Sequence, residues 1–148
     1  MKKLRENCQV KLIAFDLDGT LLDSVPDLTK AIQLTLAELN LPNQQQDSVR
    51  DWVGNGARVL VKRALSGNIK ADVPNDLFER AYPVFLRHYA EHLNENSALY
   101  TGVEQILPAL KDAGILLACI TNKPEQFTLP LLKELGLLEL FSKVVCGD

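Results

Sequence analysis

The sequence of 148 residues lacks a long apolar run, and the longest one, Ile115 to Ile120, is far too short to span a bilayer. Cysteine is also scarce, since the sequence has only three, Cys8, Cys119 and Cys146. Their spacing does not match that of metal ligands. Cys119 and Cys146 lie in strand-like apolar runs, where small buried thiols are common. These absences predict a cytoplasmic protein in a reducing compartment, without a membrane as partner.

An excess of charge of one sign is missing as well. The 16 basic and 19 acidic side chains leave a net charge of -3, which gives no electrostatic reason to expect nucleic acid or an anionic membrane as partner. Residues 1–5 are basic, but Glu6, Asn7 and Gln9 follow where a secretion signal needs apolar residues, so we expect no such signal. A hydrophobic content of 47% indicates a folded globular protein of unknown oligomeric state.

Three short apolar runs, residues 10–15, 115–120 and 143–146, predict strands. Each run is nearly continuous in apolar residues and is bounded by polar residues or glycine, as in parallel strands that are covered on both faces. Helical patterns over residues 103–113 and 124–135 precede the second and the third run. This alternation predicts an α/β fold with a Rossmann-like parallel sheet.

Pro130 lies inside the second of these helical patterns and cannot donate a backbone hydrogen bond. The sequence therefore predicts either a helix that begins near Thr128 or a kink at the proline.

Residues 25–100 differ in character, because helical patterns dominate there and no strand-like run occurs. Clear helical patterns cover residues 57–65 and 75–93. An all-helical block inserted after the first strand of a parallel sheet predicts a separate cap domain over residues 25–100. The core would then be discontinuous, made of residues 1–24 and 101–148.

Asp16 and Asp18 directly follow the first predicted strand, at the strand end where open parallel sheets bind ligands. Both side chains lean to one side, and Gly19 lets the backbone turn away. Two carboxylates this close require a cation or a proton, and hard oxygen ligands suit Mg²⁺ shared with a substrate phosphate. A carboxylate can also attack phosphorus. A helix N-cap or Asx turn is the simpler alternative, but the buried strand before the pair and residues 20–24 after it favour chemistry.

Thr121, Asn122, Lys123 and Pro124 follow the second predicted strand and open a helix. A hydroxyl, an amide, an ammonium and free helix N–H groups form a natural anion site, although simple helix capping is an equal alternative for the turn alone. Because the carboxyl ends of adjacent parallel strands meet at one edge, we expect this turn to lie beside Asp16.

The loop Gly54-Asn55-Gly56 separates two helices of the predicted cap. It is either a helix stop with a connector or a loop that reaches the substrate. Basic side chains follow on the next helix, and Arg63 among them is a candidate for contacting an acidic substrate, although most such residues are merely solvated.

The stretch from Asp16 to Ser24 resembles the first motif of the haloacid-dehalogenase superfamily, and residues 121–124 look like its second motif. Residues 52–57 and 60–65 are similar to the cap of bacterial phosphoglycolate phosphatases within that superfamily. The resemblance covers essentially the whole chain.

This resemblance implies a phosphatase that converts 2-phosphoglycolate to glycolate through an aspartyl-phosphate. Asp16 would be the nucleophile, and Asp18 would protonate the departing glycolate and then activate water. Asp16 and the backbone carbonyl of Asp18 would hold Mg²⁺, while Thr121 and Asn122 would bind the phosphate. The cap would close over a small-molecule phosphate monoester and select its leaving group. A sugar-phosphate mutase of the same superfamily is the second enzymatic interpretation.

Relatives of this kind continue with a third motif that supplies a lysine and a fourth that supplies acidic Mg²⁺ ligands. Neither has a counterpart before Asp148, and Lys123 and Lys143 lack the context of the third motif. The resemblance also implies that a missing strand would lie beside the first one and cover its apolar edge. We therefore expect a truncated chain, and a non-catalytic fragment that binds phosphate or another chain is the third interpretation.

Overall fold

The structure is a computed structural model that describes residues 9–148. The expectations for Cys8 and for a missing secretion signal concern the start of the chain, outside this range. The sheet has the order β1-β4-β5, both pairs are parallel, and its strands are β1 (Leu12–Phe15), β4 (Leu116–Ile120) and β5 (Lys143–Val145). The predicted α/β class and all three predicted strands are confirmed.

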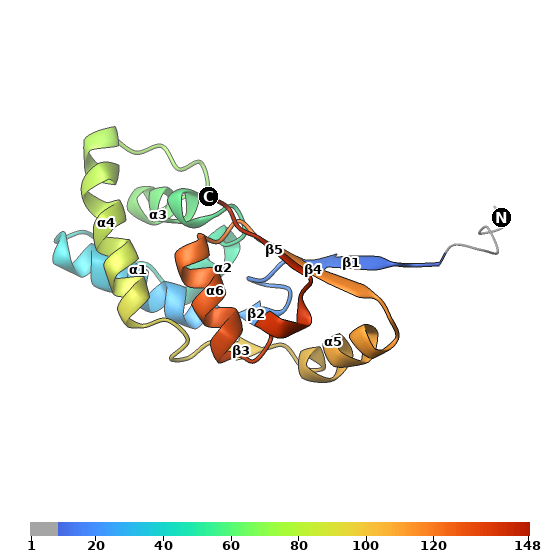
Figure 1. Ribbon diagram of the computed structural model, residues 1–148. Helices are drawn as coiled ribbons and strands as arrows, with labels where there is room; N and C mark the ends of the chain where they lie inside the picture. Colours follow the sequence, from blue (N-terminus) through green and yellow to red (C-terminus); the bar gives the residue numbers. More distant parts are fainter. Residues whose placement is uncertain (1–8) are drawn as a thin grey trace, which may run out of the picture.

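Two helices, α5 (Val103–Asp112) and α6 (Glu125–Glu134), lie on the same face of the sheet, below it in Figure 1. Leu107 of α5 and Leu131 of α6 are fully buried in a cluster that also contains Leu117 of β4. The helical periodicity of the sequence therefore places one stripe of each helix against the sheet.

The opposite face of the sheet is exposed, so the prediction of strands covered on both faces is wrong for the part of the chain that the structure describes. Leu12, Leu116 and Ile120 are 54%, 53% and 51% exposed. Leu12 pairs with Leu116 across β1 and β4, which makes the exposed side chains neighbours. The pattern correctly marks apolar side chains on both faces, but residues 9–148 provide helices for only one of them.

Helix α6 begins at Glu125 and contains Pro130 in its interior. The Thr128 N–H already donates to the Pro124 carbonyl over 3.0 Å, so the predicted alternative of a helix start near Thr128 is wrong.

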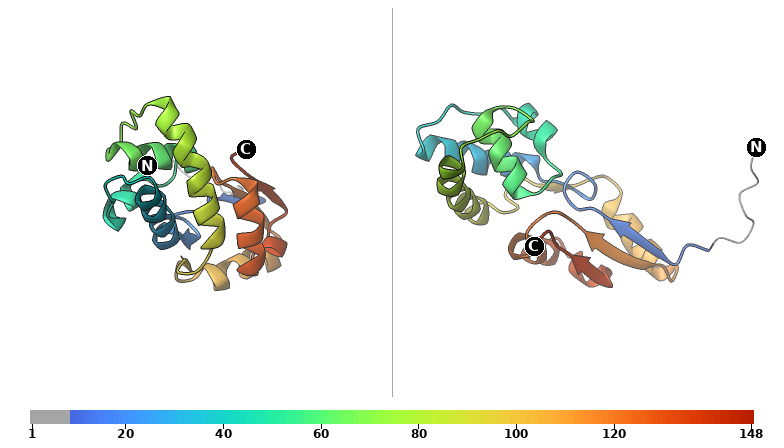
Figure 2. Two further views of the ribbon diagram at one scale, coloured as in Figure 1. Left: turned by 90° about the vertical axis from the view of Figure 1, so that its left-hand side faces the viewer. Right: turned by 90° about the horizontal axis from the view of Figure 1, so that it is seen from above.

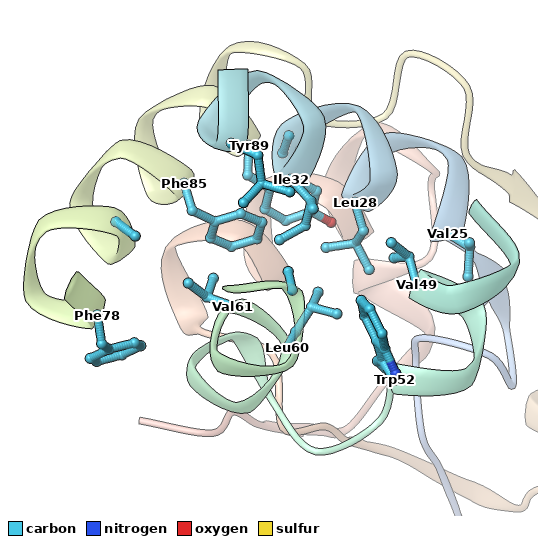
Figure 3. Close-up of a cluster of buried hydrophobic side chains, with 14 of the residues drawn as sticks. Val25, Leu28, Ile32, Val49, Trp52, Leu60, Val61, Phe78, Phe85 and Tyr89 are labelled. Atoms are coloured by element: carbon cyan, nitrogen blue, oxygen red, sulfur yellow. The ribbon is translucent and has the colours of Figure 1, made fainter. Parts of the chain in front are cut away.

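Four further helices form what we call the helical unit: α1 (Val25–Glu38), α2 (Gln46–Trp52), α3 (Ala57–Ser66) and α4 (Asn75–Glu91). Figure 3 shows its own apolar core, in which side chains from all four helices meet. The largest contributors are Leu28, Ile32, Val49, Trp52, Leu60, Val61, Phe78, Phe85 and Tyr89. Phe127 of α6 packs into the same core and links the helical unit to the sheet.

A short antiparallel ribbon connects the two parts, formed by β2 (Leu22–Asp23) and β3 (Ala98–Leu99). The ribbon lies where the chain enters and leaves the helical unit. Figures 1 and 2 place the helical unit at the carboxyl ends of β1 and β4. Within residues 9–148 no helix is both long and apolar enough to cross a membrane.

Candidate active site

The loop after β1 carries Asp16 and Asp18. Three successive backbone N–H groups, those of residues 20–22, donate to the Leu17 carbonyl oxygen over 3.0 to 3.2 Å. Gly19 has a φ of 82°, a conformation that glycine adopts without strain. The Leu17 N–H donates to Oδ1 of Asp16 over 2.7 Å. The loop is therefore a compact turn that fixes both aspartates relative to the end of β1.

The carboxylate of Asp18 is held by two side chains. Ser24 Oγ donates to Asp18 Oδ1 over 2.6 Å, and Lys123 Nζ lies 3.1 Å from both Asp18 oxygens. The Asp18 side chain is 14% exposed and that of Lys123 only 3%. Because solvent screens this ion pair little, its two charges interact more strongly than an exposed pair would.

The turn after β4 lies beside this loop, as the strand order predicts. Phe15 and Cys119 are paired in register, so the chain segments that follow them leave the sheet side by side. The Thr121 hydroxyl accepts a hydrogen bond from the Lys123 N–H over 3.2 Å, which folds the turn. The ion pair between Lys123 and Asp18 then joins the turn to the aspartate loop.

The end of β5 supports the same turn. The Gly147 N–H donates to the Lys123 carbonyl over 3.1 Å. A Cβ atom at Gly147 would lie 2.3 Å from the Asn122 carbonyl oxygen, so only glycine fits this close approach. Asp148 Oδ1 accepts a hydrogen bond from the Glu125 N–H over 2.8 Å, which caps α6.

The helical unit reaches the turn at two points. Asn122 Nδ2 donates to the Gly54 carbonyl over 2.9 Å, and Gly56 lies so close that a Cβ there would be 3.2 Å from the Asn122 carbonyl oxygen. On the other side, Lys123 Nζ donates to the Tyr89 hydroxyl of α4 over 2.6 Å. The predicted loop Gly54-Asn55-Gly56 therefore touches the turn after β4.

Arg63 and Asn55 contact each other. The Arg63 guanidinium donates from Nη1 to the Trp52 carbonyl over 2.7 Å and to Asn55 Oδ1 over 2.9 Å, and from Nε to the Ile69 carbonyl over 3.2 Å. In this arrangement Arg63 braces the loop after α2. The predicted contact of Arg63 with substrate stays a prediction.

A cavity lies between the sheet loops and the helical unit, with an empty volume of about 430 Å³ that includes its open mouth. Polar groups line one part, namely Asp16, Asp18, Tyr89, Thr121, Asn122 and Lys123. Apolar side chains line the rest, among them Leu28, Leu60 and Phe127. Two carboxylates and one ammonium are its charged groups, so an anion bound here requires further positive charge.

Burial shifts the pKa values of the groups around this cavity. Burial raises the pKa of Tyr89, whose hydroxyl therefore stays neutral. Burial by itself would lower the pKa of Lys123, but the contacts with Tyr89 and Asp18 outweigh it and raise that pKa above its ordinary value. Lys123 is thus a permanent buried cation at neutral pH.

The oxygen donors at the cavity suit Mg²⁺ only in part. The Asp16 carboxylate receives one hydrogen bond, from Leu17, and keeps lone pairs for a cation. The Asp18 carboxylate is already paired with Lys123, so it is less available to a cation. Residues 9–148 contain no group of three or more His, Cys, Asp or Glu side chains that could hold a metal ion. This set fits Mg²⁺ that keeps water and phosphate oxygens as its other ligands.

The sequence did not indicate the partners of Asp18. Ser24 lies in the aspartate motif, and a hydroxyl six residues after Asp18 was a usable signal. Tyr89 gave no signal by itself, because its hydroxyl meets Lys123 only through the packing of α4 against α6.

A parallel sheet with an aspartate pair after its first strand and a helical unit at its carboxyl ends describes an α/β protein whose candidate site lies at the strand ends. The chain belongs to the haloacid dehalogenase-like hydrolase family, whose model matches residues 13–148.

Several proteins named phosphoglycolate phosphatase are similar to this chain. One from Nitrosococcus oceani is 45% identical over 95% of this chain and 62% of its own length. Another from Pseudomonas syringae pv. tomato is 50% identical over 93% of this chain and 51% of its own length. A crystal structure of a predicted phosphoglycolate phosphatase from Haemophilus somnus has a TM-score of 0.87 and 41% identity, and covers 95% of this chain and 64% of that one. The chain thus spans about half to two thirds of the length of these relatives.

Proposed function

We propose that this chain acts as a Mg²⁺-dependent phosphatase that hydrolyses 2-phosphoglycolate to glycolate and phosphate. The observation that carries the proposal is the meeting of Asp16, Asp18 and the turn Thr121-Asn122 around one cavity. The names of the relatives support phosphoglycolate as substrate.

In the first step, a carboxylate oxygen of Asp16 attacks phosphorus and the bond from phosphorus to the glycolate oxygen breaks. Asp18, which takes up a proton when the negatively charged phosphate enters beside it, gives that proton to the ester oxygen, so glycolate leaves as an alcohol. Asp18, now a carboxylate, takes a proton from water as the water oxygen attacks the aspartyl-phosphate. Phosphate leaves, and both aspartates return to their initial states.

The surroundings of Asp18 suit these two roles. Ser24 and Lys123 fix its carboxylate in one orientation, and Lys123 balances the charge that appears when Asp18 has given up its proton. Mg²⁺ held by Asp16 and the Asp18 carbonyl would offset the repulsion between Asp16 and the phosphate. Thr121 and Asn122 would hold the phosphate oxygens with a hydroxyl, an amide and backbone N–H groups.

The helical unit, within residues 25–100, is proposed as the cap of this site, over a core made of residues 1–24 and 101–148. Gly54 and Gly56 contact Asn122, and Tyr89 contacts Lys123, so the unit can position the leaving group and exclude water.

The test is phosphate release from 2-phosphoglycolate with and without Mg²⁺, with Asp16→Asn as matched control. The proposal predicts release that requires Mg²⁺ and falls by at least about a thousandfold in Asp16→Asn. In Asp18→Asn the second step should slow, and mass spectrometry of the acid-quenched protein should find one phosphoryl group on the peptide that contains Asp16.

Two outcomes would contradict the proposal. Conversion of β-glucose 1-phosphate to the 6-phosphate, with no phosphate release from 2-phosphoglycolate, would indicate a mutase. A folded protein that neither releases phosphate from 2-phosphoglycolate nor converts β-glucose 1-phosphate would indicate a chain without catalytic activity.

A further inference from the structure

Lys123 supplies the only cationic side chain among the residues that line the cavity. Its ammonium is nearly fully buried and sits on the side of Asp18 that faces the helical unit, because its second partner is the Tyr89 hydroxyl of α4. The phosphate-binding groups proposed above, Thr121 and Asn122, lie in the turn that precedes it. The positive charge therefore lies beside Asp18, the group proposed above to protonate the leaving group.

The position of Lys123 next to Asp18 has a consequence for that leaving group. If Asp18 gives its proton to the ester oxygen of a phosphate monoester, that oxygen lies within hydrogen-bond distance of Asp18. Lys123 Nζ is 3.1 Å from the same carboxylate, so it is also near the ester oxygen. In 2-phosphoglycolate a single methylene group separates this oxygen from a carboxylate.

We propose that Lys123 is the residue that selects the substrate, by binding the carboxylate of a phosphate monoester whose leaving group is a 2-hydroxy acid. The inference rests on the proposed function, and it assigns one N–H of the Lys123 ammonium to the substrate. The two Asp18 oxygens, each 3.1 Å from Nζ, would then share a single N–H. Tyr89 holds the ammonium in place through its hydroxyl and through its ring, whose centroid is 4.7 Å from Nζ.

The cavity favours this assignment over a purely structural one. Its apolar walls, Leu28, Leu60 and Phe127, offer nothing to a carboxylate, and the two aspartates repel it. Elsewhere in the cavity an anionic leaving group would meet no second cationic side chain that could balance its charge.

The test measures binding, which does not require turnover. Calorimetry on the Asp16→Asn variant with Mg²⁺ compares 2-phosphoglycolate, ethyl phosphate, which lacks the carboxylate, and inorganic phosphate. We expect 2-phosphoglycolate to bind about tenfold more tightly than ethyl phosphate, as one charge-assisted hydrogen bond predicts. Adding Lys123→Met should abolish this difference, and the affinity for inorganic phosphate in the same variant corrects for the general loss of positive charge. Tyr89→Phe, which keeps the ammonium, should retain the difference.

A second measurement needs no substitution at Lys123. The buried ammonium exchanges its protons slowly, so its ¹⁵N signal should be visible by NMR and should shift with 2-phosphoglycolate but not with ethyl phosphate. Equal affinity for the two ligands in Asp16→Asn, or a preference that survives Lys123→Met, would overturn the inference alone. A signal that shifts equally with both ligands would also overturn it. A protein that binds none of the three ligands would overturn the proposed function together with the inference.

Discussion

Asp27, in the first turn of α1, accepts two hydrogen bonds from Asn96, a residue of the segment that leads from α4 back to β3. The Asn96 N–H donates over 2.8 Å and its side-chain amide over 3.1 Å, both to Oδ1 of Asp27. The N–H and the hydroxyl of Ser97 donate to Oδ2 over 2.8 and 2.5 Å. One buried carboxylate therefore ties together the two chain segments that connect the helical unit to the sheet.

Replacing this carboxylate should weaken the junction strongly. Asp27→Ala removes the buried carboxylate that accepts four hydrogen bonds from Asn96 and Ser97, and we expect a loss of about 2 to 4 kcal/mol in the free energy of unfolding. Urea titration followed by circular dichroism measures it. The matched control is Asp76→Ala, at an exposed first-turn position of α4, which should cost less than about 1 kcal/mol. Equal losses in both variants would contradict the role of Asp27.

The hydrogen bonds between Asp27 and Asn96 could not be predicted from the sequence, although other features of the fold could. The strands and the Asp16 loop were predictable because their signals are local, a short apolar run followed at once by carboxylates and glycine. Lys123 pairs with Asp18 across 105 positions and with Tyr89 across 34, and Asp27 meets Asn96 across 69. Such pairs depend on how the helical unit packs, which residue periodicity does not encode.

Other differences between the predicted and the observed structure arise from the shortness of single elements or from missing covering segments. The ribbon of β2 and β3 is two residues long on each strand, too short for alternation to appear. Helix α2 spans only seven residues and likewise gave no distinct helical pattern. Periodicity marked Leu116 and Ile120 as buried because it reports which residues are apolar, and whether a face is covered depends on other segments.

Gly56 should be intolerant of substitution. Its φ of 85° and ψ of 162° lie in a region that is almost restricted to glycine, and an added Cβ would crowd the Asn122 carbonyl at 3.2 Å. We expect Gly56→Ala to cost about 1 to 3 kcal/mol and to weaken phosphate binding, because the loop would move away from the turn. Gly102→Ala is the control, since Gly102 has a φ of 94° but no atom within 4 Å of the added Cβ. It should lower stability while phosphate affinity, measured by calorimetry, stays unchanged.

Arg63 allows a direct test of its predicted contact with substrate. Its guanidinium donates to the carbonyls of Trp52 and Ile69, so Arg63→Lys should lower the free energy of unfolding by about 1 to 2 kcal/mol through lost hydrogen bonds. If Arg63 also contacts substrate, the affinity for 2-phosphoglycolate should fall at least about tenfold. If it only braces the loop, the affinity of Arg63→Lys should stay within about threefold, and Asn55→Ala, which removes only the bond to Oδ1, should change stability less. The two measurements on the two variants separate these roles.

Cys119 gives a pH dependence with a definite sign. Burial, with the nearby Asp16 charge, raises the pKa of this thiol from 9.0 to about 12. A folded-state pKa above the unfolded one stabilises the fold below pH 9.0, and this contribution is lost as the pH rises from 9.0 toward about 12. Between about pH 8 and about pH 10 the protein should therefore lose about 1.4 kcal/mol that Cys119→Ala does not lose. If the unfolding free energies of the parent protein and of Cys119→Ala fell with pH at the same slope, the thiol would not be buried in this way.

The exposed face of the sheet should make the protein self-associate. Leu12 and Leu116 form an exposed apolar pair on one face of the sheet. Within residues 9–148 β1 pairs with one strand only, so its other edge is open beside this pair. Sedimentation velocity over a range of concentrations should show association that Leu116→Lys reduces, with a change in unfolding free energy below about 0.5 kcal/mol. Leu117→Ala is the contrasting variant, because Leu117 is fully buried on the opposite face and should cost about 2 to 5 kcal/mol. A parent protein that stays monomeric at every concentration would mean that the apolar pair is too small a patch to drive association.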